Sequence, residues 1–302
     1  MNKRLRIIGV ALFLSVAAYA QEAWNTTYKE IESRIKAPTF ASAIYKPGVK
    51  AKASAAKNQK AIQTTIDRCS EKGGGQVVIP AGTFMTGAIT LKNNVNLVLQ
   101  KGAVLKFAYD RTLYPNVVTR WEGLDLINYQ PCIYSNGAHN IAITGEGTID
   151  GNGSRETFWA WTGLERFGWK NGETIEDCKW AKDGNELGAR DQLQKMSEDG
   201  VPIDQRIFGL GCGLRPQLVN LVNSENILIE GVTMKDSPFW VMHPLWSKNI
   251  TVRRVTVINE GPNGDGCDPE SCEDVLIENC IFHTGDDCIA IKSGRNGDGR
   301  RD

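Results

Sequence analysis

A short β-prone unit recurs along the chain, and this recurrence limits the folds that the sequence can adopt. The unit is an Asn or Asp followed by an apolar residue, any residue and another apolar residue. Its last three copies start 23 and 25 residues apart, and a second β-prone segment follows each. β-rich units at this period indicate a solenoid. The five copies are Asn96-Leu97-Val98-Leu99, Asn140-Ile141-Ala142-Ile143, Asn226-Ile227-Leu228-Ile229, Asn249-Ile250-Thr251-Val252 and Asp274-Val275-Leu276-Ile277.

The kind of solenoid follows from the length and chemistry of this unit. A coil of a parallel β-helix takes about 20–25 residues, and equivalent strands stack about 4.8 Å apart. The recurrent Asn suits a turn, because its side chain bonds nearby backbone and tolerates the left-handed region. A leucine-rich repeat is the rival, but its LxxLxL pattern is absent. We therefore predict an all-β chain wound as a parallel β-helix.

The region before the repeats predicts a cap for this solenoid. Residues 53–72 place apolar groups on one side of a helix, and Gly73-Gly74-Gly75 ends it. This helix would cover the open N-terminal end of the β-helix. Short strands are expected at residues 77–79, 88–91, 97–99 and 103–105.

The first twenty residues have the features of a cleavable signal peptide. Lys3, Arg4 and Arg6 precede an apolar run, and Ala18-Tyr19-Ala20 fits the small-x-small cleavage site. The run is too short to span a membrane, and no Cys marks a lipoprotein cleavage point. We expect a secreted or periplasmic protein without a membrane anchor.

Charge and cysteine content narrow the partners. The chain has 35 basic and 35 acidic residues, so its net charge is zero and no nucleic-acid partner is indicated. Export permits disulfides among the eight cysteines, although several of them also fit as small buried apolar residues. The sequence contains no CxxC pair, so a structural zinc site is not expected. We expect no cofactor, no metal and a monomer.

Two segments, residues 262–269 and 284–294, concentrate acids beside glycines. Asp265 and Asp286 are 21 residues apart, as are Cys267 and Cys288. At the period of this solenoid the two segments fall on adjacent coils, so Asp265 should lie beside Asp286 and Asp287. Neighbouring strand residues normally point to opposite faces, so the chain must leave regular strand there, and Gly285 permits this.

Clustered carboxylates suit several roles. Repulsion makes one of them hold its proton near neutral pH, and a protonated acid beside ionised carboxylates is what glycosidic cleavage requires. A calcium site is the main competitor, and plain solvated turns are the third reading. The spacing alone leaves all three open.

Residues 153–218 interrupt the repeat and are interpreted as an insertion from one turn. They are rich in charges and contain Trp159, Trp161, Trp169 and Trp180. These aromatic side chains either stack on sugar rings or pack the insertion onto the body.

Five motifs, spread from about Gly73 to the C-terminus, add a family resemblance. They are Gly73-Gly74-Gly75-Gln76-Val77-Val78-Ile79-Pro80-Ala81-Gly82-Thr83 with Thr86-Gly87, Ile143-Thr144-Gly145-Glu146-Gly147-Thr148-Ile149-Asp150-Gly151, Ser237-Pro238-Phe239-Trp240 with His243-Pro244, Asn263-Gly264-Asp265, and Gly285-Asp286-Asp287. Together they resemble glycoside hydrolase family 28, the polygalacturonases. One departure is Gly264, which stands where the family has Thr.

The resemblance implies a right-handed parallel β-helix that inverts anomeric configuration. It implies Asp286 as the general acid, with Asp265 and Asp287 as the bases that activate water. Stacking does not establish inversion by itself, because Cα atoms about 4.8 Å apart contrast with carboxyls roughly 6.5–9.5 Å apart in inverting enzymes. The predicted substrate contacts are Asn263, His243, Lys292 and Arg295, and a cation at Lys292 or Arg295 would pair with a uronate carboxylate.

Two family motifs, Gly-His-Gly and Arg-Ile-Lys, are not found before the sequence ends at Asp302. We therefore expect a fragment of a longer enzyme, in which residues 1–20 are the signal peptide, 21–48 an extension and 49–302 an incomplete catalytic β-helix. The leading hypothesis is hydrolysis of α-1,4-galacturonosyl linkages in pectin. A non-catalytic pectin-binding β-helix and a calcium-dependent pectate lyase are the alternatives.

Overall fold

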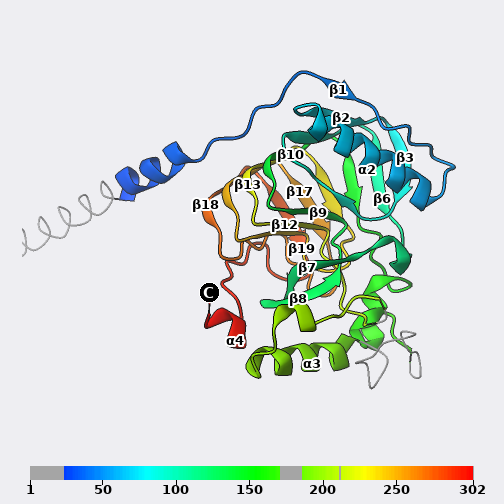
Figure 1. Ribbon diagram of the computed structural model, residues 1–302, viewed down its shortest axis with the longest axis vertical. Helices are drawn as coiled ribbons and strands as arrows, with labels where there is room; N and C mark the ends of the chain where they lie inside the picture. Colours follow the sequence, from blue (N-terminus) through cyan, green and yellow to red (C-terminus); the bar gives the residue numbers. More distant parts are fainter. Residues whose placement is uncertain (1–23, 171–185, 211, 302) are drawn as a thin grey trace, which may run out of the picture.

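Three parallel sheets wind around a common interior and form a right-handed parallel β-helix with a capping helix at its N-terminal end (Figure 1). The computed structural model describes residues 24–170, 186–210 and 212–301. The predicted fold class is confirmed. The largest sheet contains, in order, β1 (Ile44–Tyr45), β2 (Gly75–Ile79), β5 (Val95–Leu99), β10 (His139–Gly145), β13 (Glu225–Glu230), β16 (Lys248–Arg253) and β18 (Glu273–Glu278).

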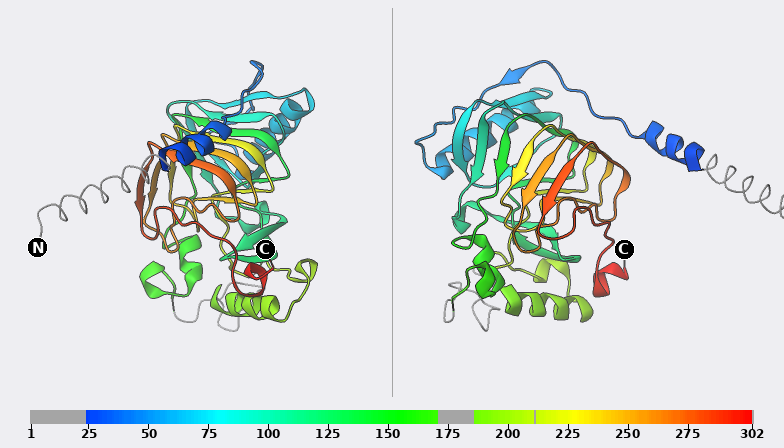
Figure 2. Two further views of the ribbon diagram at one scale, coloured as in Figure 1. Left: turned by 90° about the vertical axis from the view of Figure 1, so that its left-hand side faces the viewer. Right: turned by 180° about the vertical axis from the view of Figure 1, so that it is seen from behind.

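The other two sheets complete each coil. The second contains β3 (Gly82–Thr86), β6 (Ala103–Phe107), β11 (Thr148–Asp150), β14 (Thr233–Lys235), β17 (Thr256–Asn259) and β19 (Ile281–Thr284). The third contains β4 (Ile89–Thr90), β9 (Ile133–Asn136), β12 (Val219–Val222) and β15 (Met242–Leu245). Figure 2 shows the coils stacked in chain order, from cyan at the N-terminal end to orange at the other.

An asparagine ladder marks the same turn on successive coils. Each amide nitrogen donates to the preceding amide oxygen: Asn140 to Asn94 at 3.0 Å, Asn226 to Asn140 at 3.0 Å and Asn249 to Asn226 at 2.6 Å. All four residues have φ between 51° and 62°, a region that Asn tolerates better than most residues. The predicted turn role of this Asn is confirmed. The first member was predicted wrongly as Asn96, because β5 pairs Asn96 with Ala142 and so aligns Asn94 with Asn140.

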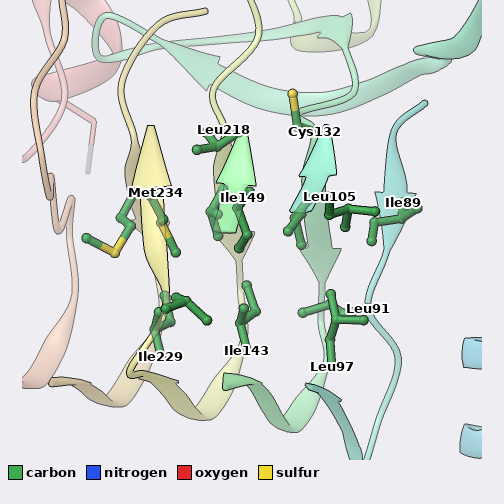
Figure 3. Close-up of a cluster of buried hydrophobic side chains, with 14 of the residues drawn as sticks. Ile89, Leu91, Leu97, Leu105, Cys132, Ile143, Ile149, Leu218, Ile229 and Met234 are labelled. Atoms are coloured by element: carbon green, nitrogen blue, oxygen red, sulfur yellow. The ribbon is translucent and has the colours of Figure 1, made fainter. Parts of the chain in front are cut away.

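Aliphatic side chains fill the interior in rows that run along the stack. Ile143 pairs in register with Leu97 and Ile229, and all three are buried. Figure 3 shows this row and the parallel one formed by Leu105, Ile149 and Met234. Each coil therefore buries its apolar face against the next, as a solenoid requires.

The capping helix α2 spans Ala55–Glu71, inside the predicted range of residues 53–72. Ser54 caps its first turn by accepting a hydrogen bond from the Lys57 N–H. Ile62, Ile66 and Cys69 are fully buried against the first coils. The apolar face identified in the sequence is thus the face that covers the β-helix.

The connections to the third sheet carry structure that the sequence pattern did not indicate. An antiparallel hairpin, β7 (Asn116–Trp121) with β8 (Leu124–Tyr129), precedes β9. Residues 153–218 contain the helices η2 (Phe158–Thr162), η3 (Glu165–Phe167), α3 (Glu186–Glu198) and η4 (Ile203–Gln205). In this region Trp161 is buried, and the Trp159 indole N–H donates to the Ser237 carbonyl at 2.9 Å. Both rings pack the region onto the body, whereas Trp180 lies outside the described residues.

Two other predictions concern the chain ends and the cysteines. The predicted signal peptide, residues 1–20, lies outside the described residues. No described helix has the length and apolar character needed to cross a membrane. Among the described residues, six cysteines are free thiols: Cys69, Cys132, Cys267, Cys272, Cys280 and Cys288. The first three of these are buried, and so is Cys212.

The ladder leads to a stability prediction at Asn226. Replacement by Ala removes two amide hydrogen bonds and puts a less tolerant residue at positive φ, so Asn226→Ala should lower the free energy of unfolding by about 1–3 kcal/mol. Asn226→Gly keeps the backbone freedom and should lose roughly half as much. Denaturant unfolding of both variants measures the difference, and equal stability of all three proteins would contradict the role of the ladder.

Candidate active site

A groove of about 600 Å³ lies beside the turns that follow the last strands of the second sheet. Acids, cations and one aromatic ring are among the side chains that line it. Its lining residues are Glu122, Gly123, Arg190, Trp240, Asn263, Asp265, Glu270, Asp286, Asp287, Ile291, Lys292, Ser293, Gly294 and Arg295.

The three predicted acids meet in this groove. One carboxylate oxygen from each of Asp265, Asp286 and Asp287 lies within 4.8 Å of the other two. Asp265 is 4% exposed, whereas the other two are open to solvent. The register differs by one residue from the predicted 21-residue spacing, since Cys267 pairs with Ile289 rather than with Cys288. Asp265 is therefore level with Asp287.

The backbone leaves regular strand at residues 285–288, which lets both exposed acids reach the groove. The Thr284 hydroxyl donates to the Asp286 carbonyl at 2.8 Å, and the Asp287 N–H donates to the Asp286 carboxylate at 3.0 Å. A Cβ at Gly285 would lie 2.7 Å from the Glu260 carbonyl. Glycine therefore allows this turn to sit close to the preceding coil.

Lys292 supplies the positive charge nearest to the buried acid. Its ammonium lies 3.3 Å from Asp265 and 3.8 Å from Asp268, and 4.3 Å above the centre of the Trp240 ring. These contacts fix the lysine on the floor of the groove. The ammonium thus lies between the acid cluster and the Trp240 ring, which is itself buried.

Asn263 is held in place by Arg215, which the sequence pattern did not indicate as a functional residue. The Arg215 guanidinium donates to the Asn263 side-chain oxygen at 2.7 Å and to the Pro238 and Pro262 carbonyls at 2.9 and 2.8 Å. Arg215 is fully buried. At the next position a Cβ on Gly264 would lie 2.6 Å from the Gly261 carbonyl. The departure from the family's Thr therefore accompanies a tight turn.

His243, predicted as a substrate contact, has no exposed surface. Its Nε2 lies 2.8 Å from Glu270, and its Nδ1 accepts from the Asn220 amide at 3.1 Å. Glu270 also accepts from Arg120 at 3.1 Å and from the Gly294 N–H at 2.8 Å. His243 thus lies behind the groove, in a buried network that holds the backbone between Lys292 and Arg295.

Arg295 lies at the rim and is oriented by an acid from the β7–β8 turn. Its guanidinium donates to Glu122 at 2.9 Å, and its N–H donates to the Gly123 carbonyl at 2.9 Å. The Arg295 side chain is 40% exposed. The structure therefore brings Asn263, Lys292 and Arg295 to the groove and leaves His243 out of it.

Burial raises the pKa of two carboxyls in this cluster. The pKa of Asp265 is raised by burial, opposed by the charge of Lys292 and assisted by that of Asp286. Burial, followed by the charge of Asp265, raises the pKa of Asp268 to about 9. Neither Asp268 carboxyl oxygen has a hydrogen-bond partner among the described residues. At Glu270 burial acts in the same direction, but the hydrogen bond from His243 and the charge of Arg120 outweigh it and lower its pKa.

The same geometry bears on a metal ion. Three carboxylate oxygens this close together are a possible start of a divalent-cation site. Calcium takes six to eight oxygen ligands, and the Lys292 ammonium already lies beside one of the three acids. A fixed positive charge in this position competes with a divalent cation for Asp265.

Parallel β-helices with a groove beside their coils form one structural class, and the solved relatives of this chain belong to it. An exopolygalacturonase from Thermotoga maritima matches with a TM-score of 0.84 and 38% identity, over 90% of this chain and 60% of that one. An exopolygalacturonase from Yersinia enterocolitica matches with a TM-score of 0.60 and 28% identity, over 82% of this chain and 44% of that one.

Sequence comparison points to one family. Residues 207–297 match the model of glycosyl hydrolases family 28. A “Probable polygalacturonase” of Vitis vinifera is 30% identical over 248 residues, which are 78% of this chain and 41% of that protein. The chain is similar to glycosyl hydrolases family 28 and is polygalacturonase-like. It spans about two fifths of the length of the curated relatives that it matches first.

The buried acid Asp268 leads to a prediction about pH and stability. Between its ordinary pKa of 3.8 and its folded value of about 9, the folded protein binds a proton that the unfolded chain releases. The contribution of this group to stability is therefore complete below pH 3.8 and is lost progressively as the pH rises towards 9. Asp268→Asn should flatten this decline, as measured by urea unfolding across that pH range.

The control for this measurement is Asp199→Asn, which makes the same acid-to-amide change on a half-exposed side chain. It should leave the pH dependence of unfolding close to that of the wild type. Equal slopes for Asp268→Asn and the wild type would contradict the protonated state of Asp268.

Proposed function

We propose that this chain carries the acid–base centre of a hydrolase that cleaves α-1,4-galacturonosyl linkages of pectin with inversion of configuration. The observation that supports it best is the convergence of Asp265, Asp286 and Asp287 in one groove, with their nearest oxygens within 4.8 Å. Asp286 is the proposed general acid, and Asp265 and Asp287 are the proposed bases for the attacking water. The similarity to glycosyl hydrolases family 28 and to polygalacturonases supports the substrate.

The exposure of the three acids fits their proposed roles as general acid and as bases. Asp286 is open to the groove and can approach the glycosidic oxygen of a polymer lying along the coils. Asp265 lies deeper, beside Lys292, whose charge favours the ionised form that a base requires. The raised pKa of Asp265 works in the opposite direction and makes it the competing proton donor.

Recognition of a uronate carboxylate is assigned to the cations of the groove. The Lys292 ammonium lies over the buried Trp240 ring, which holds it in the groove where it can meet a sugar carboxylate. Arg295 presents a guanidinium at the rim, suited to a bidentate pair. Asn263 supplies an amide in the same groove, and His243 acts indirectly through Glu270.

The remaining features of the proposal concern the chain as a whole. Residues 1–20 direct export to the periplasm or the outside, residues 21–48 form an extension, and residues 49–302 form the catalytic β-helix with its insertion at about 153–218. The protein acts as a monomer without a resident metal. Twofold or larger assembly in solution, measured by light scattering, would contradict the monomer.

A reducing-end assay on polygalacturonate tests the activity. The protein should release reducing ends equally well with and without a chelator, and Asp286→Asn should abolish the release. Asp191→Asn, at an exposed position of α3, is the matched control and should keep full activity. Loss of activity with the chelator together with ultraviolet-absorbing unsaturated products would indicate a calcium-dependent lyase instead. A folded protein without release would indicate a binding protein.

An activated leaving group distinguishes the acid from the bases. An aryl galacturonide departs without a proton, so Asp286→Asn should cleave it within about tenfold of the wild-type rate while polymer cleavage falls by roughly 10²–10⁴-fold. Asp265→Asn should lose both activities, because water is no longer activated. The reverse pattern in steady-state kinetics would assign the acid role to Asp265.

A further inference from the structure

A second cavity, separate from the acid groove, lies against the insertion. Its volume is about 910 Å³, within the range of small-ligand sites. It follows β6, at the same kind of turn that carries the acids after β17 and β19. Its lining residues are Tyr109, Asp110, Arg111, Thr112, Arg155, Glu156, Thr157, Ala160, Trp161, Gly168, Trp169, Lys170 and Leu210.

Aromatic rings form one part of its wall. Tyr109 is 43% exposed, and its hydroxyl accepts from the Trp161 indole N–H at 2.7 Å. Phe158 packs edge-on against Tyr109, with ring centres 5.0 Å apart. Tyr109 is therefore held rigidly while part of its surface stays open, which is the arrangement that suits a flat apolar face of a ligand.

Cations form another part of the wall. Arg111, Arg155 and Lys170 outnumber the two acids there, Asp110 and Glu156. Asp110 is already engaged locally, since it accepts from the N–H and the hydroxyl of Thr112 at 3.1 and 2.6 Å.

The two arginines are the feature that points to an anion. The Arg111 Nη1 is buried and has no hydrogen-bond partner within the part of the chain that the structure describes, although burying such a donor is costly. The Arg155 side chain is exposed and makes no ion pair with a described residue. Two guanidinium groups beside exposed aromatic surface suit a ligand that carries carboxylates on a ring.

Contacts join the chain segments that line the two cavities. Trp159 precedes Ala160 of the second cavity, and its indole N–H donates to the Ser237 carbonyl. Its ring also packs closely on Gly261, where an added Cβ would lie 2.5 Å from the ring. Gly261 is two residues before Asn263 of the acid groove. Strands β6 and β17 are three steps apart in the sheet, or about 14 Å at ~4.8 Å a step. A chain of a few sugar units spans such a distance.

We propose that this cavity is a second binding site for an acidic oligosaccharide, formed by Arg111, Arg155 and Tyr109, which holds a distant part of the polymer cleaved at the acid groove. The ligand class rests on the proposed function, whereas the anion specificity rests on the two arginines. The site contributes affinity for long acidic chains and has no part in bond cleavage.

Calorimetric titration tests this site in an Asp286→Asn background, where the ligand survives. A long oligogalacturonate should bind, and its methyl-esterified form of equal length, which lacks the charges, should bind at least tenfold more weakly. Arg155→Ala should weaken binding of the charged ligand about tenfold, and Arg155→Glu should weaken it further. Arg254→Ala is the control, because it removes an exposed arginine that pairs with Glu230 elsewhere on the β-helix.

Each outcome of this titration either supports or overturns the second binding site. Equal affinity of the Arg155→Ala and Arg254→Ala proteins, or no preference for the charged ligand, would overturn the second site and leave the proposed activity standing. Arg155-dependent binding by a wild-type protein that releases no reducing ends would support the site and overturn the proposed hydrolysis. Thermal unfolding of the exposed Arg155 variants should match that of the background, which excludes misfolding as the cause.

Discussion

The register between neighbouring coils decides where every functional side chain of this protein lies. Backbone groups of an inner coil pair with the coils on both sides, so a strand cannot shift by one residue without turning its apolar row out of the interior. The asparagine ladder holds that register at one turn, with amide contacts of 2.6–3.0 Å from Asn94 to Asn249. The acids lie at another turn of the same coils, so the register between coils also sets how far apart they are. Stacking thus places Asp265 level with Asp287.

Electrostatics explains why these acids need the residues around them. Three carboxylates within 4.8 Å repel one another, and the charge of Asp265 helps to keep the neighbouring Asp268 protonated. Lys292 offsets part of this repulsion at Asp265, and the buried pair of Arg120 and Glu270 fixes the backbone that carries the lysine. A charge cluster of this kind is costly to a fold. Its supporting network, rather than the acids alone, keeps the groove in one shape.

The sequence predicted the parts of the structure that repeat. A period of 23–25 residues sufficed for the solenoid, the turn role of Asn226 and the meeting of three acids, because stacking turns a sequence interval into a spatial neighbour. The predictions from this period failed where the chain departs from regular repetition. Asn96 was chosen in place of Asn94, since three asparagines stand between residues 93 and 96. The role of His243 was misplaced, because a motif shows nothing about burial. Arg215, Glu270 and the β7–β8 hairpin lie outside any period, and their contacts join residues distant in sequence. Asp268 was visible as one more acid in its segment, but only its burial distinguishes it.

The stereochemistry of cleavage remains the feature that stacking does not supply. Inverting enzymes place their carboxyls roughly 6.5–9.5 Å apart to admit a water, and retaining enzymes place them about 5–5.5 Å apart. Proton NMR of the first product formed from an α-linked oligogalacturonate measures the outcome directly. Cleavage with inversion predicts that the new reducing end appears first as the β-anomer, because water attacks opposite the leaving group. Initial appearance of the α-anomer would contradict it and would indicate a covalent intermediate on one of the three acids.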